Sequence, residues 1–514
     1  MGGEVLLWTV FIVCAIAAAV PVLLTALYSS GYTFFRVPFA SWFVLGLSGV
    51  VLILDGVGLY FWRRFRRTKK SLVEARQELT DLKQQPLIDQ IPTVCGHECL
   101  GRAEFLALLQ ILFRHPPNVK YIHVRPLPGG YGGSMTLLAK LQRNQDDSIL
   151  PRSFVVKLGD GREMADEYDK FHNYVLATLP YAPKFFRHAE WGDFAGIAYE
   201  FAGLDPDSEV QSFHQCYAGY AVIEVSDLVG QIYSDLDRAW YRGGQTDHTN
   251  LYHEYGLLSR KRERLIGHVG EMIDERDPYR TNFTAIEARL RPNLRPRFCP
   301  DLDIPWYDPV AFLRTWSRRT LSIPVYRSIV HGDLHARNAL VEIGRDGQRR
   351  VWFIDFSHTG NGLSGHRTRE AMRAGTLCDP HTGHTLRDFC RLEADVKFIL
   401  TRLQDDGDLR LAVMFERELM SCGATLYDLS VASPSIEALT VGRFRKAWQI
   451  IGEIRRRASA YLDRPDDLRP YYLSLLHATL PIVYYHQDQF ESESCERQQK
   501  RYALISSGML CARL

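Results

Sequence analysis

The chain has 514 residues, 46% of them hydrophobic, so it exceeds one typical domain and can bury a sizeable core. Its formal net charge of +2 is too small to indicate a nucleic-acid-binding protein, and no nucleic-acid partner is expected. The ten cysteines are scattered without a recognisable disulfide framework, which favours a reducing compartment for the main body of the chain.

Two apolar stretches predict a transmembrane hairpin over residues 1–66. Residues 5–27 are uncharged and long enough to cross a bilayer core of about 30 Å, and residues 42–62 are interrupted only by Asp55. Six of the eight residues 63–70 are basic. By the positive-inside rule this cluster places the N-terminus and everything after Arg63 in the cytoplasm. The sequence therefore predicts a multi-pass protein of the cell inner membrane whose main body is cytoplasmic.

A juxtamembrane helix and linker are expected over residues 67–98. Residues 71–85 are rich in helix formers, with three leucines on one side. This helix either pairs with a second copy of the chain to give a homodimer, or is a solvated spacer, and two turns of pattern do not decide between them. Pro86 and Pro92 then break the chain, and the folded part is expected to start near Cys99.

The first folded segment combines a buried helix with strands around a glycine-rich turn. Residues 102–113 are densely apolar and predict the helix. Strand-like stretches follow on either side of the turn, and the later one contains Lys157. Backbone N–H groups in such a turn approach phosphates, and the lysine reaches the α or β phosphate, although ordinary hairpin turns are also rich in glycine. The candidate phosphate-covering residues are Gly130, Gly132, Gly133 and Ser134.

The stretch after Lys157 predicts an amphipathic helix and then a strand. Glu163 and Glu167 on this helix are the candidates for a carboxylate that pairs with Lys157. Residues 194–203 then form an apolar strand that runs into small residues. Helical periodicity dominates residues 205–323 and returns over 392–404, 409–420, 435–462 and 468–485.

Residues 328–356 carry four chemically demanding side chains at fixed intervals: His331, Asp333, Asn338 and Asp355. The pattern reads as loop, strand, tight turn and strand, because two short apolar runs flank a GRDG turn. Phosphoryl transfer from a nucleoside triphosphate needs a carboxylate to orient the acceptor hydroxyl, and an amide and a carboxylate to hold Mg²⁺. A hairpin with this spacing brings all three groups to one edge.

The sequence HGDLHARN followed by IDF resembles the motifs of the aminoglycoside phosphotransferase and choline kinase group, which are relatives of protein kinases. The resemblance implies that Asp333 is the catalytic base and that His331, in the same motif, supports the loop. It also implies that Asn338 and Asp355 are the Mg²⁺ ligands, that Lys157 and Glu167 pair, and that Glu200 and Phe201 meet the adenine of ATP. Asp388 resembles the acid that bonds the loop backbone near His331, displaced by an insertion.

The stretch around HTLRDFCRLEADVKF is also similar to kinase-like domains attached to prokaryotic multi-component conflict systems. The expected fold is α+β and two-lobed, with an N-lobe over residues 99–205 and a largely helical C-lobe over residues 206–514. The expected function is an ATP- and Mg²⁺-dependent phosphotransferase that acts on a hydroxyl of an unidentified acceptor. The alternative is a nucleotide-binding, catalytically weak or inactive signalling module of a bacterial conflict system.

Overall fold

The computed structural model describes residues 92–114, 119–127, 134–143, 149–179, 183–200, 209–255, 263, 265–267, 306–344, 347–373, 379–421, 424–431 and 435–514. The expected transmembrane hairpin and nearly all of the juxtamembrane segment lie outside these ranges, so they stay predictions. Among the described residues, no helix is long and apolar enough to cross a lipid bilayer. All of them belong to one compact unit, Gln90–Leu514.

The N-lobe is built on a six-stranded sheet with the order β1-β2-β3-β4-β6-β5. Only β1 and β2 pair in parallel, and the remaining neighbours are antiparallel. β1 precedes the expected domain start at residue 99, so the sheet includes part of the segment expected to be a linker. The strands are β1 (Thr93–Cys95), β2 (Val119–Pro126), β3 (Met135–Arg143), β4 (Ile149–Asp160), β5 (Lys184–Trp191) and β6 (Phe194–Glu200).

Two helices complete the N-lobe. The helix expected over residues 102–113 is α3 (Ala103–Leu112), and its Leu108 and Leu109 are fully buried in the same hydrophobic cluster as the sheet. The helix expected after Lys157 is α4 (Gly161–Lys170), followed by a π-helical turn, η2 (Phe171–Val175). Asp160 caps α4 by accepting from the backbone N–H of Arg162 at 2.9 Å.

Two three-stranded sheets connect the N-lobe to the helices of the C-lobe. The hairpin predicted around the GRDG turn is β10 (Ala339–Ile343) with β11 (Arg349–Phe353), and β7 (Glu209–Ser212) pairs with its outer side. The second sheet has the order β12-β9-β8 and comprises β8 (Gln245–Asn250), β9 (Ser322–Ser328) and β12 (Gly383–His384). The periodicity of residues 205–323 predicted helix only. β7 and β8 correct that prediction, because they are short polar strands stabilised by distant partners.

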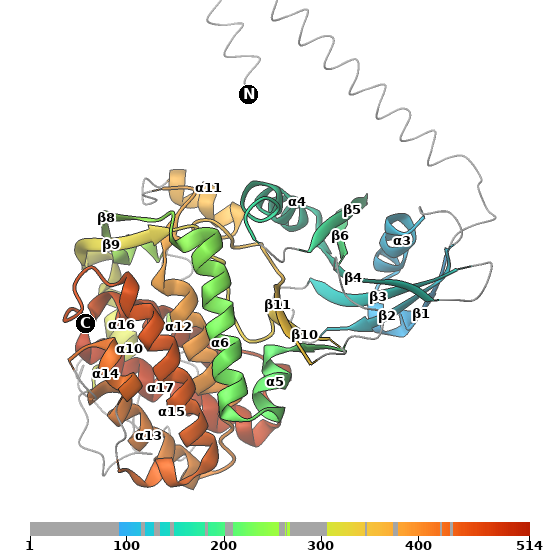
Figure 1. Cartoon of the computed structure of the whole chain (residues 1–514). Helices are drawn as coiled ribbons and strands as arrows, with labels where there is room; N and C mark the ends of the chain where they lie inside the picture. The colour runs from blue at the N-terminus through green and yellow to red at the C-terminus, as the bar shows by residue number, and fades with distance from the viewer. Residues whose placement is uncertain are drawn as a thin grey trace, which may run out of the picture. The chain divides into compact units, whose positions relative to one another are not determined.

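The C-lobe is largely helical, as expected (Figure 1). Its α-helices are α5 (Phe213–Gly219), α6 (Val222–Leu236), α7 (Leu251–Glu254), α10 (Pro309–Thr315), α11 (Gly365–Arg373), α12 (Leu386–Asp395), α13 (Asp406–Ser421), α14 (Leu426–Val431), α15 (Gly442–Ala458), α16 (Arg469–Thr479) and α17 (Glu493–Arg513). Short 3₁₀ or π turns extend or link these helices: η3 (Asp237–Tyr241), η4 (Trp316–Arg318), η5 (Val396–Leu400), η6 (Glu437–Thr440), η7 (Ser459–Tyr461), η8 (Leu480–Tyr484) and η9 (Gln487–Gln489). A further 3₁₀ turn, η1 (His97–Leu100), lies in the N-lobe.

The C-lobe core brings together segments that are far apart in the sequence. α12 packs against α15 and α16, and α17 packs against α13 and α16. α12 is buried along its whole length. This helix therefore forms a rigid support directly behind the loop that carries Asp333.

Candidate functional site

Lys157 joins the two lobes through a pair of carboxylates. Its Nζ lies 2.7 Å from Glu167 Oε2 on α4 and 2.5 Å from Asp355 Oδ1, which follows β11. Burial alone would lower the pKa of Lys157, but Asp355 and Glu167 outweigh it and raise that pKa, so the lysine is a cation. The structure therefore brings together three predicted site residues from three separate elements.

Glu167, rather than Glu163, is the partner of Lys157. The Glu167 side chain is fully buried, and the Tyr199 hydroxyl donates to its other oxygen at 3.5 Å. Glu163 lies in the first turn of α4 and is exposed. The pairing expected from the sequence is confirmed, because Glu167 sits on the α4 face that meets the sheet.

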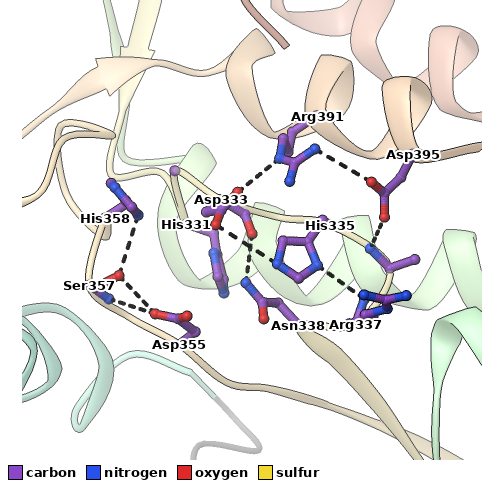
Figure 2. Close-up of polar contacts among 12 residues, drawn as sticks. His331, Asp333, His335, Arg337, Asn338, Asp355, Ser357, His358, Arg391 and Asp395 are labelled. Carbon is purple, nitrogen blue, oxygen red and sulfur yellow. Dashed lines mark hydrogen bonds and ion pairs between the residues drawn. The ribbon is translucent and has the colours of Figure 1, made fainter. Parts of the chain in front are cut away.

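The carboxylate of Asp333 is held from two directions (Figure 2). Arg391 of α12 donates from Nε to Asp333 Oδ1 at 2.8 Å, and His335 Nε2 lies 3.8 Å from the other oxygen. Burial would raise the pKa of Asp333, but Arg391, His335 and His358 together hold it well below its usual range. Asp333 is therefore an ionised carboxylate, and its side chain keeps 24% of its surface exposed.

Asp388 holds the backbone of the same loop. Its carboxylate accepts from the N–H groups of His331 and Gly332, each at 2.8 Å, and from the Tyr241 hydroxyl at 2.9 Å. Gly332 has φ +82°, and a Cβ there would lie 2.5 Å from the backbone oxygen of His358. The structural role expected for Asp388 is thus confirmed, and the loop has room only for glycine at position 332.

His331 links the loop to the strand that ends at Asp355. It is fully buried, and its Nε2 lies 3.1 Å from the carbonyl oxygen of Ile354. This position fits the supporting role expected from the resemblance. A buried ring that contacts a carbonyl is suited to fixing the distance between the loop and β11, and the assignment of His331 to the catalytic motif stays a prediction.

Asn338 and Asp355 offer the oxygen donors that a hard cation such as Mg²⁺ prefers. Asn338 Nδ2 donates to the carbonyl oxygen of Asp333 at 2.9 Å, which directs the amide nitrogen into the loop and leaves Oδ1 as the remaining acceptor. Burial would raise the pKa of Asp355, but Lys157 outweighs it and keeps the carboxylate ionised. The donor set therefore fits a divalent cation, with one amide oxygen and one carboxylate.

Asp355 also has an unusual backbone. Among the described residues it is the one non-glycine residue with positive φ, at 64°. Such conformations cost about 1–3 kcal/mol and cluster at functional sites. The Ser357 hydroxyl donates to Asp355 Oδ1 at 2.8 Å and stabilises the turn. Ser357, two residues after Asp355, thus supports the aspartate directly.

An apolar layer lies between the lobes next to this polar centre. It consists of buried side chains from the N-lobe sheet and from the β10–β11 hairpin that form one hydrophobic cluster. Four of these side chains are cross-strand neighbours: Leu138 on β3 is opposite Val155 on β4, and Leu340 on β10 is opposite Trp352 on β11. We call the set the interlobe layer; its members are Leu138, Val155, Leu340, Trp352 and Ile354.

The expected nucleotide-binding residues around the glycine-rich turn and at the end of β6 are described only in part. Gly130, Gly132, Gly133 and Phe201 lie outside the described residues, so their expected contacts with nucleotide stay predictions. Ser134 immediately precedes β3 and approaches Gly159 next to the end of β4, where an added Cβ would lie 3.1 Å from that of Ser134. Glu200 is the last residue of β6 and is buried, and its expected contact with the adenine stays a prediction.

Sequence reasoning missed Arg391 and Asp395, the partners that α12 supplies to the loop. Asp395 accepts from the backbone N–H of Ala336 at 2.8 Å and lies 3.4 Å from Arg391 Nη1. The signal was present in the spacing: Asp388, Arg391 and Asp395 are three and four residues apart, which places them on one face of a helix. The interlobe layer was missed because its members alternate along ordinary strands.

Comparison with known proteins agrees with the resemblance stated for the sequence. Residues 120–275 match the family described as Ternary complex associated domain 9. No curated protein matches the chain. The similar solved structures include an aminoglycoside-3'-phosphotransferase of type VIII, with 12% identity, a TM-score of 0.30, and coverage of 69% of this chain and 100% of that one.

Structures of the aminoglycoside phosphotransferase APH(4)-Ia are also similar. A thermostable mutant in a ternary complex with AMP-PNP and hygromycin B has 14% identity and a TM-score of 0.29, over 72% of this chain and 95% of that one. A related mutant complex with ADP and hygromycin B has 11% identity and a TM-score of 0.27, over 70% and 94%. The chain has a mixed α/β fold with a helical C-terminal part, and its residues 120–275 match the family Ternary complex associated domain 9.

Proposed function

We propose that the chain is an ATP- and Mg²⁺-dependent phosphotransferase that acts on a hydroxyl group. The observation that carries this proposal is the contact of Lys157 with both Glu167 and Asp355, which joins an N-lobe strand, an N-lobe helix and the C-lobe hairpin. In this family of reactions the lysine orients the phosphates and the lysine–glutamate pair must be in place.

Each polar group then has a distinct task. Lys157 binds the α and β phosphates, Asn338 and Asp355 hold the metal, and Asp333 orients the acceptor hydroxyl and accepts its proton. The bound Mg²⁺ would neutralise charge that develops on the transferred phosphoryl group. The adenine would lie against the interlobe layer, close to Glu200 at the end of β6 and to Phe201, the next residue in the sequence.

Substitution of Asp333 tests the proposal. Asp333→Asn keeps the shape of the side chain and removes its charge, so phosphate transfer should fall by about 100-fold or more while nucleotide binding is retained. The measurement is production of ADP by purified protein with ATP and Mg²⁺, offered a panel of hydroxyl acceptors including an aminoglycoside, together with titration of a fluorescent ATP analogue. Exposed Asp463→Asn is the matched control. Equal turnover in Asp333→Asn and wild type would exclude the assigned role.

A second function is favoured by one observation. Arg391 Nε donates to Asp333 Oδ1 at 2.8 Å, and a carboxylate that is hydrogen-bonded to a guanidinium is a weaker base. In this alternative the chain binds nucleotide as a signalling module of a conflict system and turns it over slowly. Wild type that binds ATP without measurable turnover, together with faster hydrolysis in Arg391→Gln, would support the signalling function over the transferase.

The location of the protein is part of the proposal. We infer that residues 1–66 anchor it in the inner membrane, with the kinase-like unit in the cytoplasm, because residues 63–70 are strongly basic. The full chain should stay in the membrane fraction after carbonate washing. In inside-out vesicles, protease should digest the kinase-like unit, whereas right-side-out vesicles should protect it. Protection in both orientations would contradict this topology.

A further inference from the structure

Helix α4 makes a second set of contacts, in addition to that of Glu167 with Lys157. Lys170, at its last position, donates from Nζ to the carbonyl oxygen of Ser357 at 2.7 Å and to that of Leu363. Both carbonyls belong to the stretch that directly follows Asp355. Burial lowers the pKa of Lys170 to about 8, while Asp166 and Glu167 oppose the shift. The ammonium group is thus enclosed between α4 and this stretch.

The next contact joins α4 to α11. Arg369 donates from Nη1 to Asp166 Oδ1 at 3.0 Å. The Asp166 carboxylate also lies against Gly365, the first residue of α11, where a Cβ would be 2.3 Å from its Cγ. Asp166 therefore faces the positive N-terminal end of α11 and pairs with a cation one turn further along. Figure 1 shows α4 and α11 next to each other.

A third contact follows α4 itself. The Tyr174 hydroxyl, in the π-helical turn η2, lies 2.8 Å from His381 Nδ1. The Tyr174 ring also covers Gly360, where an added Cβ would lie 3.1 Å from the ring. Residues 357–373 and His381 thus contact α4, or the turn that continues it, at three separate points. In the sequence, this segment is recognisable only as an insertion that displaces Asp388.

We propose that residues 357–373 and 379–387 act as a latch on α4, and that Lys170 is a positioning residue that keeps Glu167 against Lys157. Lys170 lies three residues after Glu167, so the two side chains are neighbours on the helix. Because α4 has only ten residues, fixing its last turn to the C-lobe fixes Glu167 as well. Without the latch, Lys157 would retain Asp355 alone, the carboxylate that the proposed metal needs.

The latch needs no covalent modification, because its donors and acceptors are ordinary side chains and backbone carbonyls of the chain. It differs in this respect from activation loops that are ordered by phosphorylation. The effect of Lys170 on turnover rests on the proposed phosphotransfer. The stabilisation of α4 by these contacts does not depend on that function.

The test compares Lys170→Met with Lys170→Arg, using exposed Lys184→Met on β5 as the matched control. Hydrogen exchange of the α4 amides reports the latch without any turnover. We expect at least tenfold faster exchange in Lys170→Met, and exchange within threefold of wild type in Lys170→Arg and Lys184→Met. Unchanged exchange in Lys170→Met would overturn the latch, even if the wild type proves inactive.

Kinetics then test the positioning role. In an active wild type, Lys170→Met should lower kcat at least tenfold and raise the KM for ATP, while the KM for the acceptor stays within twofold. Lys170→Arg should restore most of kcat. Full kcat in Lys170→Met despite fast α4 exchange would overturn the positioning role, as would lost kcat with unchanged exchange.

A second variant covers the case in which Lys170→Met does not fold. Arg369 is 54% exposed in its side chain, so Arg369→Gln should fold. It should speed α4 exchange threefold or more, and adding Asp166→Asn should give little further change because both act through one contact. Exposed Arg373→Gln, on the same helix, is the control. Equal exchange in Arg369→Gln and Arg373→Gln would overturn the α11 contact as part of the latch.

Discussion

Asp388 is a single carboxylate on which the shape of the loop that carries Asp333 depends. It is fully buried and satisfies two backbone N–H groups and one tyrosine hydroxyl. Burial raises its pKa, whereas His331, the two N–H groups and Tyr241 stabilise the ionised form. At the residue scale, this arrangement concentrates much of the loop's stability in one side chain.

Asp388→Ala should lower the free energy of unfolding by about 3 kcal/mol or more, because it leaves three buried donors without an acceptor and each costs about 1–3 kcal/mol. Urea unfolding of residues 86–514 measures the change. The exposed Asp463→Ala should stay within about 0.5 kcal/mol of wild type. A loss below about 1 kcal/mol in Asp388→Ala would show that water or another side chain replaces the carboxylate.

At the element scale, Glu416 connects three parts of the C-lobe. Its carboxylate on α13 lies 2.6 Å from Lys397 Nζ on η5 and accepts from the Ser506 and Tyr502 hydroxyls of α17, each at 2.7 Å. Both charged side chains are fully buried. A buried pair with all partners in place is tolerated, whereas a single unpaired charge is costly. These helices are therefore matched to one another by charge as well as by shape.

Glu416→Leu should destabilise the fold by about 3–5 kcal/mol, because it leaves the buried Lys397 ammonium without an opposite charge. The double variant with Lys397→Met should recover much of this loss, since no charge is left buried. A double-mutant cycle by chemical unfolding measures the coupling. The partly exposed pair Lys500–Glu496 on α17 is the control, with an expected contribution below about 1 kcal/mol. Additive losses in the Glu416 cycle would contradict the pairing argument.

At the scale of the whole molecule, two histidines make folding sensitive to acid. Burial, with Arg387 and Arg327, lowers the pKa of His384 to about 3. Burial, with Arg337, lowers that of His214 to about 4. Both values lie below the unfolded value of about 6.5, so the unfolded chain binds more protons between these limits. Stability is therefore fully present above about pH 6.5 and declines as the pH falls.

The slope should approach about 1.4 kcal/mol per pH unit for each histidine between pH 6 and 5. Thermal unfolding at pH 7.5, 6.0 and 5.0 measures it in wild type and in His384→Asn, which removes one of the two contributions. Exposed His253→Asn should keep the wild-type slope. The same slope in His384→Asn as in wild type would show that other groups govern the acid response.

The sequence was most informative where chemistry demands several residue types at fixed spacing. The loop from His331 to Asn338 and the return strand to Asp355 followed from short-range pattern and order, and the Lys157–Glu167 pair followed from the family resemblance. Contacts between distant segments left no such trace. β7 and β8 are polar strands defined by their partners, and Lys170 was indistinguishable from any solvated lysine. Arg391 and Asp395 shared a helical face with Asp388, yet only the packed structure shows which loop that face meets.

The left-handed backbone of Asp355 determines how this position can be probed. In a library of all substitutions, asparagine and glycine should be the best tolerated for expression, because both adopt positive φ readily, and β-branched residues the worst. Asp355→Asn therefore isolates the loss of charge, whereas Asp355→Ala adds backbone strain to it. We expect expression and turnover to rank the variants differently. Expression would report the requirement for positive φ at this residue, and turnover would report the requirement for its negative charge.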